Sequence, residues 1–236
     1  MSRYLWINLI SWSVPFLYSF VPPVRFYKRI PQVILTFVSV GGCFIAWDVW
    51  ATHRGDWGFS PSYLSGIGLF GLPIEEILFF FFIPYACLFT YAHLSHYLPE
   101  RRIRFPRAVN AVLAALCLTG ALVFRGQDYT RSVLISCALF FVVTLVWQHD
   151  LLESRTFWIY LGVTYVPFFI VNYFLTSPPI VWYNPEAIWG IRITTIPLED
   201  FFYSFAMLSF YLLGYRFLCG PRARSGAQGP ERGGES

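Results

Sequence analysis

Pro73-Ile74-Glu75-Glu76 and, 124 positions later, Pro197-Leu198-Glu199-Asp200 are two copies of one short motif: a proline, an aliphatic residue and two adjacent acids. Each copy leads directly into an apolar, aromatic-rich segment. Carboxylates next to membrane-type sequence are costly and usually functional. Because that cost recurs in register, the motif predicts that these four acids carry the function.

The composition is that of an integral membrane protein. Of 236 residues, 56% are hydrophobic and 13% are charged, whereas a soluble domain carries about 25% charged residues. The five cysteines lack Cys-x-x-Cys spacing, and four of them lie singly in apolar runs. We therefore expect small core side chains and not a metal or disulfide framework. Nucleic acid is not expected as a partner, because no basic run is interleaved with stacking aromatic residues.

Seven segments approach the roughly 20 apolar residues that a membrane helix needs. They are Tyr4–Phe20, Pro31–Trp50, Ile74–Tyr97, Ala108–Phe124, Ser132–Trp147, Phe157–Leu175 and Leu198–Leu218. The first is read as a retained span, because it lacks a small-residue cleavage pattern. The sequence thus predicts an all-α integral membrane protein with seven transmembrane helices and a disordered cytoplasmic tail at 219–236.

The motif belongs to a longer internal repeat. An offset of 124 residues pairs, without a gap, Pro61 with Pro185, Gly66 with Gly190, Phe81 with Phe205 and Tyr91 with Tyr215. We therefore expect a first three-helix repeat in residues 1–100, a connector helix in 101–126 and a second three-helix repeat in 127–218. Matching helices are four crossings apart, so the repeats should be parallel, with a ligand pocket between them.

The cations are distributed unevenly between the two predicted faces. Twelve Lys and Arg residues fall on the face that holds the tail, and five fall on the face that holds the N-terminus. The positive-inside rule then predicts an external N-terminus and a cytoplasmic C-terminus.

Two interpretations of the acids remain open. Acids in a first helical turn interact favourably with the helix dipole, and a preceding proline is well tolerated, so the motif could be a plain helix start. The alternative is acid catalysis, because burial favours the protonated form of a carboxylic acid, which could then donate to a carbon–carbon double bond in a dry site. Adjacent helical residues point about 100° apart, so one acid of each pair should face the bundle interior.

Aromatic side chains that follow the motifs suit a cationic intermediate, since aromatic faces attract cations. The candidates for substrate contact are Phe79, Tyr85, Phe202 and Tyr203, although phenylalanine is also an ordinary lipid-facing residue. Asp48 and Asn172 occupy matching positions in the repeat. They could orient or protonate the motif acids, or could equally lie at the membrane interface.

Other motifs do not support a cofactor or a metal. The run from Gly66 to Gly71 matches G-x-G-x-x-G but lacks the strand–helix context, and the adjacent acids would repel a pyrophosphate. Four histidines are too few for a membrane di-iron oxidase. A retinal protein needs a lysine in its last helix, whereas the single lysine is Lys28, in a predicted loop. No cofactor and no metal are therefore predicted.

The duplicated Pro-x-Glu-Glu/Asp motif on this helix plan resembles the membrane-integral, flavin-independent lycopene cyclases, in their fused single-chain form. The resemblance spans residues 3–218, and both motif copies match. It implies that the ψ-ends of lycopene are cyclised to β-ionone rings, giving γ-carotene or β-carotene, in a non-redox reaction of carotenoid biosynthesis. By motif match, Glu75 and Glu199 would be the acid/base residues, one donor site per repeat, with Glu76 and Asp200 as their partners and Pro73 and Pro197 in support.

Alternatives stay open at this point. A proton-coupled membrane carrier or a non-catalytic carotenoid-binding protein would also use paired acids in apolar surroundings. The sequence leaves open whether one or both ends of lycopene are closed, the ring type, which acid donates, the oligomeric state and any need for a lipid or a reduced cofactor. Expected partners are lycopene and membrane lipids, and association with other carotenoid-pathway enzymes is a further open question.

Overall fold

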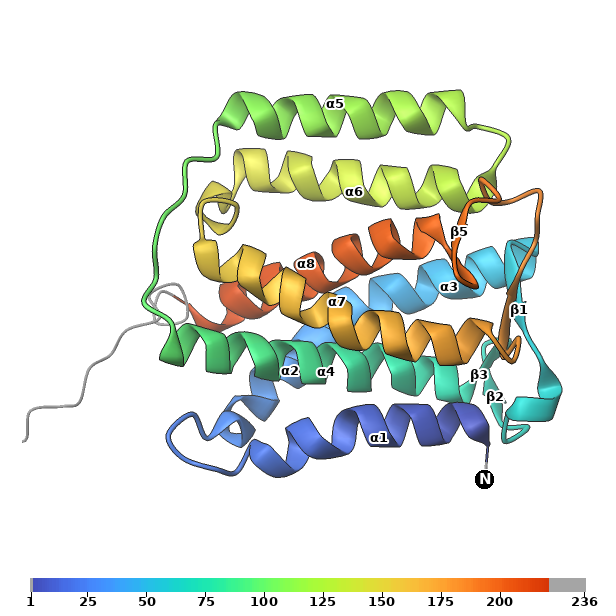
Figure 1. Cartoon of the computed structure of the whole chain (residues 1–236), viewed down its shortest axis with the longest axis horizontal. Helices are drawn as coiled ribbons and strands as arrows, with labels where there is room; N and C mark the ends of the chain where they lie inside the picture. Colours follow the sequence, from blue (N-terminus) through green and yellow to red (C-terminus); the bar gives the residue numbers. More distant parts are fainter. Residues whose placement is uncertain (1, 221–236) are drawn as a thin grey trace, which may run out of the picture.

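A computed structural model describes residues 2–220, and Figure 1 shows its bundle of long helices lying side by side. The helical elements are α1 (Arg3–Tyr18), η1 (Phe26–Arg29), α2 (Ile30–Thr36), η2 (Phe37–Gly41), α3 (Gly42–Arg54), η3 (Pro61–Tyr63), α4 (Ile74–Tyr97), α5 (Arg107–Val123), α6 (Asp128–Val146), η4 (His149–Leu151), α7 (Arg155–Thr176) and α8 (Leu198–Cys219). The second predicted span corresponds to one continuous segment, η1 to α3, which contains a π-helical turn at η2.

Within residues 2–220, five helices are long and apolar enough to cross a membrane: Phe26–Arg54, α4, α6, α7 and α8. The predicted spans at α1 and α5 are also helical, but at 16 and 17 residues these helices are shorter than the other five. The structure therefore shows a predominantly helical protein with membrane-type helices, and seven crossings stay a prediction. The predicted tail lies almost wholly outside the described residues.

The expectation of an all-α fold needs one correction, because short strands are present between the helices. They are β1 (Trp57–Phe59), β2 (Gly68–Leu69), β3 (Leu72–Pro73), β4 (Val181–Tyr183), β5 (Arg192–Ile193) and β6 (Ile196–Pro197), in three two-stranded antiparallel sheets. They lie at one end of the bundle, here called the hairpin end, where the N-terminus also lies (Figure 1). The pairing of β2 with β3 and of β5 with β6 satisfies backbone hydrogen-bonding groups in the two loops that precede the buried motif acids.

The repeat read from the sequence recurs in the backbone. The β2–β3 hairpin pairs Gly68 with Pro73, and the β5–β6 hairpin pairs Arg192 with Pro197, each 124 positions later. Glycine occupies a left-handed backbone conformation at Gly66 and again at the matching position, with φ of 82° and 79°. These conformations favour glycine, which explains why that residue persists in both copies.

Strands β1 and β4 join the two repeats. Trp57 pairs with Tyr183 and Phe59 pairs with Val181. Val181 and Tyr183 are the repeat counterparts of Trp57 and Phe59, so this antiparallel register is the one that a two-fold axis between the repeats would produce. Matching helices run in the same direction, since α1 and α6 both begin at the hairpin end, as do α4 and α8 (Figure 1). Helix α5 lies along α6 at the edge of the bundle, beyond the two sets of matching helices (Figure 1).

Candidate active site

The two motifs form the first turns of α4 and α8, at the hairpin end. Pro73 and Pro197 lie immediately before these helices in an extended conformation, and each also ends a hairpin strand. Proline fixes its own φ and lacks an N–H group, so it ends the strand pairing and starts a helix at little cost. The hairpin thereby delivers two acids at each helix entrance, where the helix dipole favours negative charge.

The first acid of each motif binds the backbone of its own hairpin loop. A Glu75 carboxylate oxygen accepts a hydrogen bond from the Ser65 N–H at 2.6 Å, and Glu199 accepts one from the Trp189 N–H at 2.5 Å. Both glutamates are 0% exposed. Because the same hydrogen bond occurs 124 positions later, these two acids have equivalent structural roles: each connects its hairpin loop to the start of the following helix.

Further contacts tie these two helix starts to their neighbours. The Thr130 hydroxyl on α6 donates to Glu199 at 2.6 Å, and the Asn8 amide on α1 donates to the backbone oxygen of Glu75 at 2.7 Å. In the described residues, the second carboxylate oxygen of each of these glutamates has no hydrogen-bond partner. Neither glutamate lines the cavity that lies between the helices of the two repeats.

The second acid of each motif faces that cavity and accepts hydrogen bonds from tyrosines. Glu76 accepts one from the Tyr4 hydroxyl at 2.5 Å. Asp200 accepts two, from Tyr129 at 2.7 Å and from Tyr183 at 2.8 Å, one on each carboxylate oxygen. The structure therefore brings one acid from each repeat to a single cavity, together with three phenol groups.

Tyr183 lies on β4, outside the membrane-type helices. Burial and the neighbouring Asp200 carboxylate raise the pKa of Tyr183 well above its usual value. The hydroxyl therefore keeps its proton and acts as a hydrogen-bond donor to Asp200.

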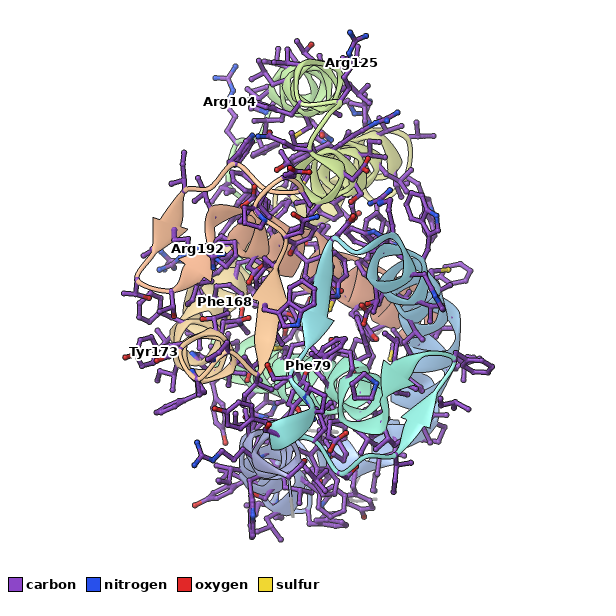
Figure 2. The ribbon with its side chains drawn as sticks, turned by 90° about the vertical axis from the view of Figure 1, so that its right-hand side faces the viewer. Phe79, Arg104, Arg125, Phe168, Tyr173 and Arg192 are labelled. Carbon is purple, nitrogen blue, oxygen red and sulfur yellow. The ribbon has the colours of Figure 1, made fainter. Side chains whose placement is uncertain are left out.

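The cavity has a volume of about 270 Å³ and receives side chains from α1, α3, β1, α4, α6, α7, β4 and α8. Its acids lie toward the hairpin end, and its remaining wall is largely apolar and aromatic. Figure 2 looks along the helices from that end: Phe79 lies near the middle of the bundle and Phe168 on α7, whereas Tyr173 lies on the outer side of α7. The arrangement is a hydrophobic chamber with carboxylic acids at one end.

Asp48 and Asn172 both line the cavity, as their matching positions in the repeat suggest. Asp48 is 2% exposed and accepts hydrogen bonds from the Trp57 indole at 2.8 Å and the Thr52 hydroxyl at 3.2 Å. The Asn172 amide instead donates to a backbone oxygen of its own helix, that of Phe168, at 3.0 Å. Asp48 thus adds a third acid to the chamber.

The four aromatic residues expected to contact substrate do not all reach the cavity. Phe79 and Tyr203 line it, whereas Tyr85 and Phe202 do not. Tyr85 is buried on another side of α4, with its ring 5.4 Å from that of Phe26. Phe202 is 38% exposed and its ring lies 6.0 Å from Trp189. For these two residues, which lie outside the chamber wall, substrate contact stays a prediction.

The tyrosines that donate to the acids were missed by the sequence reasoning. Tyr4 and Tyr129 occupy equivalent places in α1 and α6, but they are 125 residues apart, one more than the offset of the motifs. A gapless comparison therefore hides the pair. Tyr183 corresponds to Phe59 under the 124-residue offset, so its hydroxyl has no counterpart that a repeat search could find. Within residues 2–220, no group of three or more His, Cys, Asp or Glu side chains could hold a metal ion.

Comparison with known proteins gives the family. A family model described as lycopene cyclase matches residues 2–94 and 108–218. The gap between the two matches falls at the end of α4 and the linker before α5. No curated protein and no solved structure matches the chain. Both motifs, the three tyrosines and the cavity walls lie inside the matched stretches, so the family predicted from the repeated motif is confirmed, and the chain belongs to the lycopene cyclase family of carotenoid-biosynthesis enzymes.

Proposed function

We propose that this protein cyclises the ψ-ends of lycopene to β-ionone rings by acid–base chemistry, without a redox step. The observation that carries the proposal is the convergence of Glu76 and Asp200, one from each repeat, on one apolar aromatic chamber. The substrate and the product are isomers, so the reaction needs one proton delivered and one proton removed.

The geometry favours Glu76 as the proton donor and Asp200 as the base. Glu76 accepts a single tyrosine hydroxyl on Oε2, and among the described residues its Oε1 has no donor and is free to meet a substrate in the cavity. Asp200 accepts a tyrosine hydroxyl on each oxygen, a pattern that suits a carboxylate. The motif resemblance pointed instead to Glu75 and Glu199, which here fasten the hairpin loops.

The proposed reaction has three steps. Glu76 gives its proton to the terminal double bond of the polyene, which leaves a tertiary carbocation. The next double bond closes on that cation and forms the six-membered ring. Asp200 then takes a proton from the ring and leaves the ring double bond, and return of that proton to Glu76 restores the site.

The chamber walls suit the cation and exclude water. Phe79, Tyr203 and Trp57 present aromatic rings to the cavity, and each aromatic face attracts a cation by about 0.5–2 kcal/mol. Water would capture the cation as an alcohol, so an apolar wall is needed for loss of a proton to be the only outcome. The same wall binds a hydrocarbon through its apolar surface.

The size of the chamber fits one end of a carotenoid. An apolar cavity of about 150 Å³ holds benzene, so a cavity of about 270 Å³ has room for roughly ten or eleven carbon atoms by the same ratio. The rest of a C40 chain must therefore extend out of it. Val163 and Pro167 on α7 line the cavity and are also exposed on the helix surface, which provides a sideways opening toward the bilayer.

Expression in lycopene-accumulating cells tests this function. The wild-type protein should convert red lycopene to a cyclised, orange-yellow product. Glu76→Gln and Asp200→Asn keep the side-chain shape and should each lower conversion strongly. Unaltered lycopene that co-purifies with the wild-type protein would instead indicate a carotenoid-binding protein, and gradient-dependent transport without product would indicate a carrier.

A further inference from the structure

The two repeats share their hairpins and their helix directions but not the side chains that fill the space beside each motif helix. The chamber lies across the interface of the two repeats, and away from its acids its wall is formed by α1, α4, α7 and α8. Exchanging the two repeats gives a matching location beside α6, α8, the segment α2 to α3 and α4, because these are the counterparts of the helices around the chamber. Four of the residues that line the chamber have larger counterparts at the matching location.

On α4 the chamber is lined by Ala86 and Cys87, whose counterparts on α8 are Phe210 and Tyr211. On α7 it is lined by Val171, whose counterpart is Trp47. With the 125-residue offset of the paired tyrosines, Pro15 on α1 corresponds to Phe140 on α6. At every one of these four positions, the side chain in the second location is the larger one.

These larger side chains contact one another and fill their space. The Phe140 and Phe210 rings lie 5.7 Å apart, and Phe44, the counterpart of the cavity residue Phe168, lies 6.4 Å from the Tyr211 ring in a stacked arrangement. Phe140 is 0% exposed and Tyr211 is 2% exposed.

The helices around this second location also approach closely. The Tyr211 hydroxyl donates to the backbone oxygen of Phe80 at 2.6 Å and rests where a side chain at Gly41 would lie. A Cβ added at Gly214 would come within 2.9 Å of Val40. The counterparts of the two glycines are Tyr165 and Thr90. Glycine, one from each repeat, thus permits close packing at the matching location, whereas the counterparts of both glycines are larger residues.

We propose that the chain has a single ring-closing chamber, bounded by α1, α4, α7 and α8, and that aromatic side chains close the matching location beside α6, α8 and the segment α2 to α3. This inference rests on the proposed function and deepens it. Both ends of a carotenoid must then enter the same chamber in turn, and a product with two rings forms by two separate visits. The two cavity-facing acids serve one reaction centre and not one centre per repeat.

The test is to fill the chamber and measure initial rates of ring closure with membranes that contain the full-length protein. Ala86→Phe copies the residue found at the matching position of α8 and should lower ring closure at least twenty-fold. The loss should be the same for lycopene and for the carotenoid that already carries one ring. Two equal chambers would leave about half of the rate, and that result would overturn the proposal.

Controls keep the outcomes distinct. Ala115→Phe makes the same change on the exposed face of α5 and should leave the rate unchanged. A second route avoids any packing defect: Glu76→Gln and Asp200→Asn should each lower closure of both substrates by about 10²-fold or more, whereas two independent chambers would leave about half of the rate with either variant. If the wild-type protein fails to cyclise lycopene, the proposed function itself is refuted. That outcome can be told apart from all of the results above, because each of them requires an active wild-type protein.

Discussion

Replacement of one acid at a time within a single motif separates chemistry from loop structure. Glu76→Gln removes the proposed donor while keeping its shape. General acid catalysis contributes roughly 10²–10⁴-fold, so the rate of cyclisation should fall by about that factor, equivalent to about 3–5 kcal/mol in the activation barrier. The stability of the protein should change little, because Gln can still accept the Tyr4 hydrogen bond.

Glu75→Gln should show the opposite pattern. Its bond to the Ser65 N–H at 2.6 Å changes from charge-assisted to neutral. Hydrogen bonds to charged groups contribute about 1.5–3 kcal/mol and neutral ones about 0.5–1.5 kcal/mol, so the protein should lose about 1–1.5 kcal/mol of stability. For a chain of this size, each kcal/mol of stability corresponds to about 2–4 °C in the midpoint of thermal unfolding, so this midpoint should fall by about 2–6 °C.

The assay combines two measurements on the same membranes. Initial rates of ring formation are compared at equal protein level. The thermal midpoint is the temperature at which half of the detergent-solubilised protein is no longer monodisperse after heating. The assignment of Glu76 as the proton donor would be refuted if Glu75→Gln lowered the rate of cyclisation as much as Glu76→Gln does and left the thermal midpoint unchanged. It would make the first acid of the motif the chemical one, as the resemblance implied.

Three further predictions concern the second motif, the closed location and the orientation. Tyr183→Phe, which copies Phe59 at the matching position, removes one donor to Asp200 and should slow cyclisation about ten-fold, measured as initial rate at equal expression. Gly41→Ala should cost about 1–3 kcal/mol of stability, because the added methyl group overlaps the Tyr211 hydroxyl. Gly42→Ala is the control: the space beside Gly42 is open, so its thermal midpoint should equal that of the wild type. A reporter fused after Ser236 should be cytoplasmic, and an external signal would reverse the predicted orientation.

Much of the fold could be predicted because it depends on local properties of the chain. Length and hydropathy of each segment predict membrane-type helices, and the offset between Pro73 and Pro197 predicts that two stretches fold alike. The short strands escaped prediction, since Trp57–Phe59 is three residues long and pairs with Val181–Tyr183 far along the chain. Such pairing is a property of the folded bundle and not of either segment.

The candidate site was predicted in part. The four motif acids, Asp48 and Phe79 could be selected because acids and aromatic residues in apolar sequence are informative on their own. The helical angle between neighbours also predicted that one acid of each pair would face inward. It could not say which one, because the rotation of α4 about its axis is set by packing against α1 and α7.

The sequence by itself determined the membrane class, the repeat, the motif acids and the family, because composition, spacing and identity are written along the chain. Only the tertiary structure decided that Glu76 and Asp200 meet at one chamber while Glu75 and Glu199 fasten the hairpin loops. It also supplied the tyrosine donors and the filling of the matching location. These features depend on which side chains, from helices distant in sequence, occupy the same volume, so two related sets of helices can enclose a cavity at one location and a packed core at the matching one.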